Sequence, residues 1–516
     1  MGAVNRTKKS ALNTTVSIVF AVVNSLLTFL LNAVFIRLLG LEYAGINSLF
    51  SSILQLLNIA DLGISNAILF RLYKKIADND DDGINLILTT YKRICFVVAG
   101  VIAIGGFCCM PFLDHLVKEA PSFPEPLWSL FIIVLANSVV THAFNFTGQM
   151  LTAKQEHYIK TIVQYVCKFL TSGLQLLVLF LTKNIYLYLG VTLFISVVRN
   201  IVYATIVRKR YNAHWNSHKR LDKAERISLW KDTGSLAFYK ICRTLDVTID
   251  TLLITKFVAV ATTAIYSSVR VVVSFLEECF GNINDGMMAS IGDLHAQGDK
   301  KQVSNVFYQS MHLTFLVFGV LTVTLVPLLS PFVLWWIGYT LPDECIYLIL
   351  LNFFMGVFGN HVATFRNSMG IFKKGWKRPF FTALFNLIFS TWLIIKFGLL
   401  GTLIGTTIAR VLTLHWYDPW LVCRHGFDEK PTRYYIHFVL YILIVFVISL
   451  IVLFIARMLP ASDGIISLLW HGIVYVLVAF VLVWGVGYAF PEQKPLLNRL
   501  LSLVKPHLKR NHGDKQ

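Results

Sequence analysis

Fourteen apolar stretches of helix length constrain the fold of this chain more than any other feature. Their approximate limits are 12–36, 45–70, 89–111, 127–148, 161–182, 184–207, 235–257, 262–287, 306–330, 344–365, 380–397, 399–422, 434–457 and 463–489. About 20 apolar residues are enough to cross the hydrocarbon core of a bilayer as a helix. Because only 14% of the residues are charged, well below the roughly 25% of soluble domains, the sequence predicts an all-α polytopic membrane protein with fourteen transmembrane helices.

The ninth stretch is less regular than the others. Its apolar run continues past Pro327 and Pro331 to Ile337. Proline lacks the amide hydrogen that the interior of a helix uses, so we expect the helix to break there. A short surface helix is expected to follow the break.

The uneven distribution of basic residues predicts how the helices are oriented. With fourteen spans, 34 of the 46 Lys and Arg residues fall on the side that holds both termini, and 6 fall in the loops of the other side. Loops rich in Lys and Arg remain in the cytoplasm, so both termini are predicted to be cytoplasmic. The net charge of +18 then consists of orientation charges beside anionic lipid headgroups, and it requires no nucleic acid as a partner.

An internal repeat relates two parts of the chain. An offset of 219 residues aligns Thr141-His142 with Asn360-His361, Met150 with Met369, and Lys154 with Lys373. An even number of spans separates the two copies, so we expect two six-helix lobes in parallel pseudo-repeat around a central cavity, with two C-terminal helices appended. The predicted divisions are 1–233 for helices 1–6 with a cytoplasmic linker, 234–425 for helices 7–12, and 426–516 for helices 13–14 with a basic cytoplasmic tail.

Ionisable side chains interrupt the seventh and eighth spans. They are Lys240, Arg243, Asp246, Asp250, Arg270, Glu277, Glu278 and Asp285. A charged side chain at mid-bilayer costs about 2.5 to 3.5 kcal/mol on insertion scales, so such residues are expected to face a bundle interior or a water-filled cavity. Arg243, Asp246 and Asp250 are spaced to lie on one helical face. Arg243 and Asp246 belong either to a binding site or to an ion pair that braces two helices, and both interpretations stay open.

Two further ionisable residues lie within apolar spans. Asp61 is in the second span, and Arg410 is the lone cation of the twelfth, just after Gly401 and Gly405. The two glycines, four residues apart, predict close helix packing. Asp61 either has a transport role, which is to line a cavity or to bind a coupling ion, or it makes an interhelical hydrogen bond, and both interpretations stay open.

The sequence lacks the motifs of catalytic and metal sites. No P-loop, HExxH or GxSxG pattern occurs, and the eight cysteines form no CxxC pair. The loops on the side opposite the termini are short, the longest covering about 111–127. We therefore expect no enzyme, no metal and no cofactor, apart from a coupling proton or sodium ion.

Four segments of small and apolar residues carry a resemblance to a known family. They are Phe35–Gly45 together with Asp61–Gly63, Leu334–Gly338, Asn360–Lys374 and Lys396–Gly405. In these segments the chain resembles the bacterial polysaccharide flippases of the Wzx type, in the multidrug/oligosaccharidyl-lipid/polysaccharide exporter superfamily. The resemblance covers essentially all of residues 10–425.

This resemblance implies a flippase that moves a polyprenyl-diphosphate-linked oligosaccharide across the bacterial cytoplasmic membrane by alternating access. The product would be a capsule, an exopolysaccharide or a similar surface glycan, and the partners would be the lipid-linked substrate, membrane lipids and polysaccharide assembly proteins. Helices 1, 2, 7 and 8 would line the cavity. Helix 1 departs from the lipid II flippase, because it has no arginine within the membrane.

The same resemblance assigns roles to the ionisable residues. A diphosphate needs cations in a low-dielectric cavity, and arginine binds phosphate through two parallel hydrogen bonds. The predicted substrate-binding cations are Arg243, Arg270, Arg410 and Lys240. The carboxylates predicted to tune the site or to carry the coupling ion are Asp61, Asp246, Asp250, Glu277 and Glu278.

Two other functions compete with this interpretation. A cation-coupled multidrug antiporter of the same superfamily would need an acidic cavity. Six cations within the spans, which include Lys168 and Arg199 besides the four named above, balance the six acids named above and do not favour it. A membrane glycan polymerase or ligase would need a large loop on the outer face, which the short loops do not provide.

Overall fold

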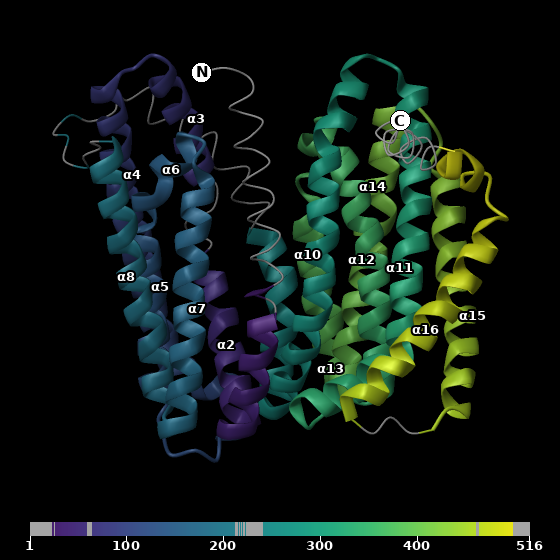
Figure 1. Ribbon diagram of the computed structural model, residues 1–516, viewed down its shortest axis with the longest axis horizontal. Coiled ribbons are helices and arrows are strands. Elements are labelled where there is room, and N and C mark those ends of the chain that lie inside the picture. The colour runs from purple at the N-terminus through teal and green to yellow at the C-terminus, as the bar shows by residue number, and fades with distance from the viewer. Residues whose placement is uncertain are drawn as a thin grey trace, which may run out of the picture. The chain divides into compact units, whose positions relative to one another are not determined.

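The computed structural model describes residues 23–24, 26–58, 64–211, 215, 217, 219, 222, 241–460 and 464–498, apart from the side chains at 66, 157, 282, 283, 285, 286, 289, 372 and 373. Every regular element in these ranges is a helix, and most of the helices run roughly parallel or antiparallel to one another within their own part of the chain (Figure 1). The predicted all-α class is therefore confirmed.

The predicted spans have helical counterparts within the described ranges. By length and hydropathy, nine described helices could cross a membrane, or ten if the bent pair Leu127–Ala143 and Asn145–Ala153 forms one span. One of the nine, Arg378–Phe427, covers both the eleventh and the twelfth predicted spans. The first, second, seventh and fourteenth spans include residues outside the described part. The chain is a multi-pass membrane protein.

The chain divides into two compact units, Met1–Ser268 and Val269–Gln516, and each is described by itself. The division falls inside α10, which spans Val260–Ala296. The predicted boundaries after residues 233 and 425 follow the sequence repeat instead, and they stay a prediction.

The first unit is a bundle in which α5 contacts both α4 and α8, and α8 contacts α7. Its helices are Leu26–Leu39, α2 (Leu41–Leu57), α3 (Ile64–Ala77), α4 (Asp81–Cys109), α5 (Leu127–Ala143), η4 (Asn145–Gly148), α6 (Gln149–Ala153), α7 (His157–Thr182), α8 (Ile185–Tyr211) and residues 241–257. A tight turn joins α7 to α8. Lys183 has a left-handed backbone there, and the Asn184 side chain accepts a hydrogen bond from the Leu187 amide, which caps α8.

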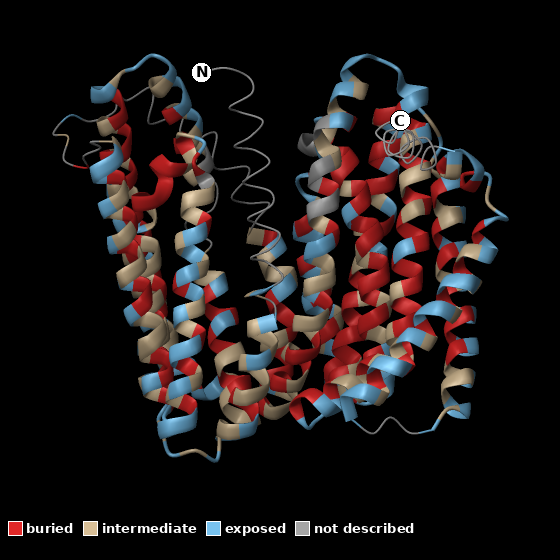
Figure 2. Cartoon of the chain, in the orientation of Figure 1, coloured by how far each residue is buried: buried red, intermediate tan, exposed pale blue. Residues whose placement is uncertain are grey.

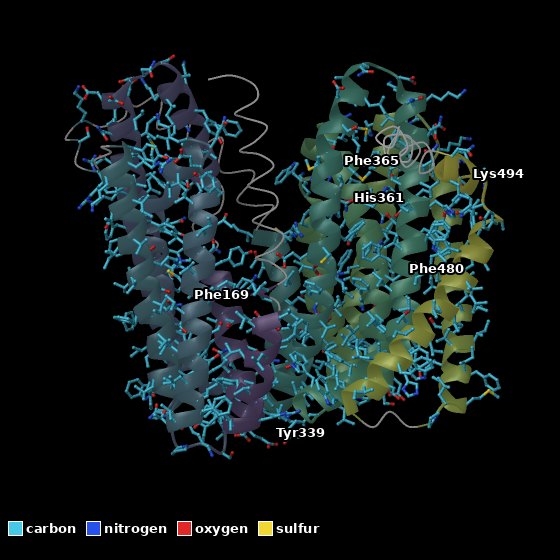
Figure 3. All side chains as sticks on the ribbon, in the orientation of Figure 1. Phe169, Tyr339, His361, Phe365, Phe480 and Lys494 are labelled. Atoms are coloured by element: carbon cyan, nitrogen blue, oxygen red, sulfur yellow. The ribbon has the colours of Figure 1, made fainter. Side chains whose placement is uncertain are left out.

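The second unit is built around α11 and α12, the helices with the most buried apolar faces (Figure 2). Its helices are α11 (Lys300–Ile337), α12 (Asp343–Ser368), η5 (Ile371–Gly375), α13 (Arg378–Leu412), α14 (Leu414–Val422), α15 (Thr432–Met458) and α16 (Gly464–Gly487). In the interior, Nε2 of His361 in α12 lies 2.8 Å from the Ser310 hydroxyl of α11. The rings of His361 and Phe365, which Figure 3 labels, each have their centre 5.0 Å from that of the Phe307 ring. Nε2 of this buried histidine thus has a polar partner, whereas Nδ1 has none among the described residues.

The capping residues at the start of two helices are also 219 residues apart, which is the offset of the predicted repeat. Asp80 caps α4 by accepting a hydrogen bond from the Gly83 amide at 2.8 Å, and Asp299 caps α11 through the Gln302 amide at 2.9 Å. An aspartate at this position satisfies an amide that has no partner within the helix. α4 and α11 are thus equivalent elements of the two copies.

Close packing inside α13 follows from its glycines. The helix turns back on itself at Gly398, where φ is 57° and ψ is −137°. A Cβ atom on Gly401 would lie 2.2 Å from the Leu393 carbonyl oxygen, and one on Gly405 would lie 2.5 Å from the Ser390 amide nitrogen. The eleventh and twelfth predicted spans therefore form a hairpin with backbones in contact, as the glycine spacing predicted.

The expected break in the ninth span is wrong. α11 continues through Pro327 and Pro331 to Ile337 and ends at Gly338, which has a left-handed backbone. The two prolines are four residues apart and so lie on one side of the helix, where they remove two adjacent backbone hydrogen bonds. The rest of the helix persists because its residues Leu329, Val333 and Trp336 are buried against the unit. Packing by neighbouring helices is what allows proline inside membrane helices.

A buried ionic cluster joins three helices of the second unit. Asp418 of α14 has no accessible surface, and its Oδ2 lies 2.9 Å from Nη1 of Arg366 in α12. Its Oδ1 lies 3.3 Å from Nε of Arg378, at the start of α13. Two guanidinium groups therefore compensate one carboxylate in a site that excludes water.

We expect Asp418→Asn to destabilise the second unit strongly, because the Arg366 guanidinium would stay buried beside a neutral amide. Removing one partner of a buried ion pair costs about 3–5 kcal/mol. The measurement is thermal unfolding of the purified protein in detergent. The control is Asp428→Asn, which breaks the exposed ion pair with Lys300 and should change the melting temperature little. Equal melting temperatures for the two variants would contradict the assignment.

A second cluster fastens the segment after α16 to α15 and α11. The Glu492 carboxylate is 2.7 Å from Nη2 of Arg433 and 3.2 Å from Nε2 of His437. Gln493 lies 2.6 Å from Nε2 of His312 in α11. Burial raises the pKa of Glu492, but the hydrogen bonds from His437 and Arg433 outweigh burial and lower this pKa from 4.5 to about 2.

This cluster predicts a pH dependence of stability. The folded pKa of Glu492 is below the unfolded value, so its contribution is complete above about pH 4.5 and is lost as the pH falls towards 2. A shift of this size corresponds to up to about 3 kcal/mol. Glu492→Gln should lower the melting temperature at neutral pH and flatten its decline in acid. If the melting temperatures of the variant and of the unchanged protein fall equally in acid, Glu492 is not responsible for the pH dependence of stability.

Candidate functional site

Four helices predicted to line a cavity meet in the first unit: Leu26–Leu39, α2, residues 241–257 and the start of α10. The Asn32 amide nitrogen donates to the Ser268 hydroxyl at 2.9 Å, which ties the first helix to α10. A Cβ atom on Gly45 would lie 2.1 Å from the Val260 carbonyl oxygen, so α2 approaches the start of α10 at a position that only glycine fits. These contacts bring the first helix and α2 against the start of α10, and the cavity that the resemblance implies stays a prediction.

Three of the predicted site residues lie on the helix of residues 241–257, and they become more buried along it. Arg243 is exposed, Asp246 is half-buried and Asp250 is buried, with 6% of its surface accessible. Asp250 Oδ2 lies 3.4 Å from the Tyr266 hydroxyl of α10. Thr255 and Thr263 join the same two helices through hydroxyl groups 3.0 Å apart. The buried carboxylate is therefore held at the interface between this helix and α10.

One face of α10 carries the other predicted cation. Tyr266, Arg270 and Glu277 are four and seven residues apart in turn, and helical periodicity places them on the same face. The nearest nitrogen and oxygen atoms of Arg270 and Glu277 are 3.4 Å apart, and the side chains keep 29% and 31% of their surface accessible. A pair at this distance and exposure holds its members loosely. Arg270 thus has Glu277 as a nearby partner, and its side chain stays partly accessible.

The remaining predicted site residues are dispersed. Glu278 is exposed on α10, and Arg410 is half-buried in the last turn of α13. Lys240 and Asp61 lie outside the described residues. The assignment of all these residues to one site stays a prediction.

No role was predicted from the sequence for the hydroxyl groups of Tyr266 and Ser268. The Tyr266 hydroxyl contacts Asp250, and the Ser268 hydroxyl accepts a hydrogen bond from Asn32. A signal was present, because Tyr266 precedes Arg270 by four residues and therefore shares its helical face. The position of Asp250 opposite Tyr266 required the packing of two helices, which periodicity alone does not give.

The chain matches a model of a known protein family. The model is described as polysaccharide biosynthesis protein, and it covers residues 10–284, more than half of the chain. A search of curated proteins finds no significant match.

Solved structures share the fold of the chain at low sequence identity. The lipid II flippase MurJ in an inward closed conformation gives a TM-score of 0.69 at 11% identity, covering 92% of this chain and 99% of that one. An inward-facing multidrug resistance MATE family transporter of the MOP superfamily gives 0.63 at 13% identity, covering 78% and 94%. A MATE transporter from Vibrio cholerae gives 0.54 at 16% identity, covering 82% and 99%.

These similar proteins are transporters and flippases rather than catalysts, in line with the prediction that the chain is not an enzyme. The family match covers the described site helices up to Asn284. The chain belongs to the polysaccharide biosynthesis protein family, and it has the fold of MOP-superfamily transporters and flippases.

Proposed function

We propose that this protein is a flippase for a polyprenyl-diphosphate-linked oligosaccharide, which it moves across the bacterial cytoplasmic membrane by alternating access. The observation that carries the proposal is Arg270. Its guanidinium lies on an apolar membrane helix, keeps 29% of the side-chain surface accessible and makes a loose contact with Glu277. A partly accessible cation on an apolar helix can be reached by an anionic group, whereas a structural cation such as Arg366 is sealed.

The chemistry of a diphosphate suits the residues of this region. Arginine offers a planar fork of donors that matches two phosphate oxygens, and its charge offsets that of the diphosphate where water is scarce. Arg243 lies exposed on the helix that packs against α10 and supplies a second guanidinium. The family description, polysaccharide biosynthesis, and the MurJ description, lipid II flippase, both point to lipid-linked sugars. Oligosaccharide assembly for a capsule or exopolysaccharide is the use that we propose.

The proposed orientation places both termini in the cytoplasm. It rests on the 34 Lys and Arg residues on the side of the termini. In this orientation the lipid-linked unit would enter from the cytoplasmic leaflet, where such units are made.

We assign the coupling ion, a proton or a sodium ion, to Asp250. Its carboxylate is buried next to the Tyr266 hydroxyl, and a carboxylate in partial burial can exchange a proton or bind a cation during a transport cycle. Asp246, half-buried one turn away on the same face, would tune the affinity of this site.

A cation-coupled multidrug antiporter is the second candidate, and the MATE transporters that share the fold favour it. The two candidates differ in the charge of the cargo. A drug cation would be bound by the carboxylates of residues 241–257, and loss of Arg270 would not impair its transport. A diphosphate requires the arginines.

The test measures how many lipid-linked units reach the outer leaflet in cells that carry Arg270→Ala or Arg243→Ala. Charge-assisted hydrogen bonds contribute about 1.5–3 kcal/mol, so we expect each variant to lower outward transfer at least about tenfold at equal abundance in the membrane. Arg270→Lys should retain part of the activity, because it keeps the charge and loses the fork.

The matched control is Lys168→Ala, which removes an exposed cation from α7 and should leave transfer unchanged. Normal outward transfer in both alanine variants would refute the role of the two arginines. Broad drug sensitivity of a deletion strain with an intact surface glycan would instead support the antiporter.

A further inference from the structure

A cleft in the first unit lies apart from the residues assigned to transport. It has a volume of about 530 Å³ and is bordered by α4, the end of α5, η4, α8 and Trp215. A smaller hollow of about 250 Å³ adjoins it and shares Phe144, Thr147 and Asn200 with it. Together they form one opening on the side of the bundle where α4 begins and α8 ends.

All charged side chains among the described residues that line the cleft are cationic. Lys92 of α4 and Arg208 of α8 meet at Trp215: the Lys92 Nζ lies 3.5 Å from its carbonyl oxygen, and the Arg208 guanidinium lies 5.3 Å from the centre of its ring. The adjoining hollow adds Lys160 and Arg199. No acidic side chain is among the described residues that line either space.

Two buried N–H groups in the lining lack acceptors. Asn200 and Trp215 each have 7% of their surface accessible, and neither Nδ2 of Asn200 nor Nε1 of Trp215 has a hydrogen-bond partner among the described residues. A buried donor without an acceptor costs about 1–3 kcal/mol. Cations and unpaired donors, with no acid nearby, are complementary to an anion with several acceptor oxygens, such as a phosphate.

The rest of the cleft is apolar and open to the side. Phe96 of α4 and Val197 and Ile201 of α8 line it, and they keep 47%, 39% and 59% of their surface accessible. In a membrane-spanning bundle, such side chains at the edge of the protein contact acyl chains. The occupant therefore has a phosphate at one end and hydrocarbon at the other.

In the second unit, the helix face that corresponds to the open side of this cleft is covered by another helix. Phe315 of α11 lies 219 residues after Phe96 of α4, the offset that relates the caps of these two helices. Phe315 is fully buried, and its ring stacks on Tyr441 of α15 at 4.2 Å. In the second unit an appended helix thus covers the face that stays open in the first.

We propose that the first-unit cleft binds one anionic phospholipid of the surrounding bilayer, with the phosphate between Lys92, Arg208, Asn200 and Trp215 and an acyl chain along Phe96 and Ile201. Basic pockets between membrane helices on the cytoplasmic side suit anionic headgroups. This lipid is a resident of the leaflet on the side where α4 begins, and it is distinct from the transported cargo. It takes the place that α15 occupies in the second unit.

The test uses the full-length protein, purified and delipidated in a neutral detergent, with phosphatidylglycerol added as the probe. Native mass spectrometry measures the bound fraction. We expect one phosphatidylglycerol per chain, preferred over phosphatidylcholine with the same tails. The double variant Lys92→Gln/Arg208→Gln should bind it at least about tenfold more weakly, because each cation near a headgroup contributes about 1 kcal/mol.

A charge-matched control removes two cations from the same side without altering the cleft. It is Lys209→Gln/Lys219→Gln, in which both side chains are exposed and binding should be unchanged. Arg208→Gln alone, at the exposed end of α8, serves if the double variant does not fold, and it too should weaken binding.

Four outcomes would overturn the proposal. One is equal binding in the cleft variant and the control. The second is equal affinity for phosphatidylglycerol and phosphatidylcholine. The third is displacement of phosphatidylglycerol by inorganic phosphate alone, which would indicate an ion site without a lipid. The fourth is its displacement by a polyprenyl diphosphate in competition, which would assign the cleft to the cargo.

Discussion

A charged side chain inside a membrane bundle needs either a sealed partner or access to water, and the second unit shows both solutions. Asp418 shows the first solution: it has no accessible surface and lies between Arg366 and Arg378. Arg270 and Glu277 show the second, because both keep nearly a third of their surface accessible and touch at 3.4 Å. The sealed cluster of Asp418 suits a structural contact that stays the same throughout a transport cycle. The second arrangement suits a site that must exchange one anionic partner for another during a transport cycle.

Much of the fold could be predicted from the sequence, because membrane helices need long apolar stretches and satisfy their backbone internally. The spans, the repeat and the glycine contact of Gly401 and Gly405 follow from that. The continuity of α11 through Pro327 and Pro331 could not be predicted, since it depends on burial by neighbouring helices. For the same reason the partners of Asp250 and Asp418 were missed: each lies on another helix, and side-chain periodicity describes only one helix at a time.

The two copies of the repeat have diverged in how their surfaces are covered. α4 and α11 begin with the same aspartate cap, yet the face of α11 around Phe315 is covered by α15, while the face of α4 around Phe96 borders an open basic cleft. The cluster of Glu492, Arg433 and His437 fixes the C-terminal segment in the second unit. α15 thus covers in the second unit a face whose counterpart stays open in the first, and this open face is where we propose that a lipid binds.

The central proposal is that Arg243 and Arg270 each contribute to binding the phosphorylated head of a lipid carrier. Direct binding of a polyprenyl diphosphate to the purified protein in neutral detergent tests it best, with a neutral polyprenol of equal length as the comparison. The account predicts saturable binding of the diphosphate that is much tighter than that of the polyprenol, and loss of this preference in Arg243→Ala/Arg270→Ala. Equal affinity for the two lipids, or an unchanged preference in the double variant, would contradict it.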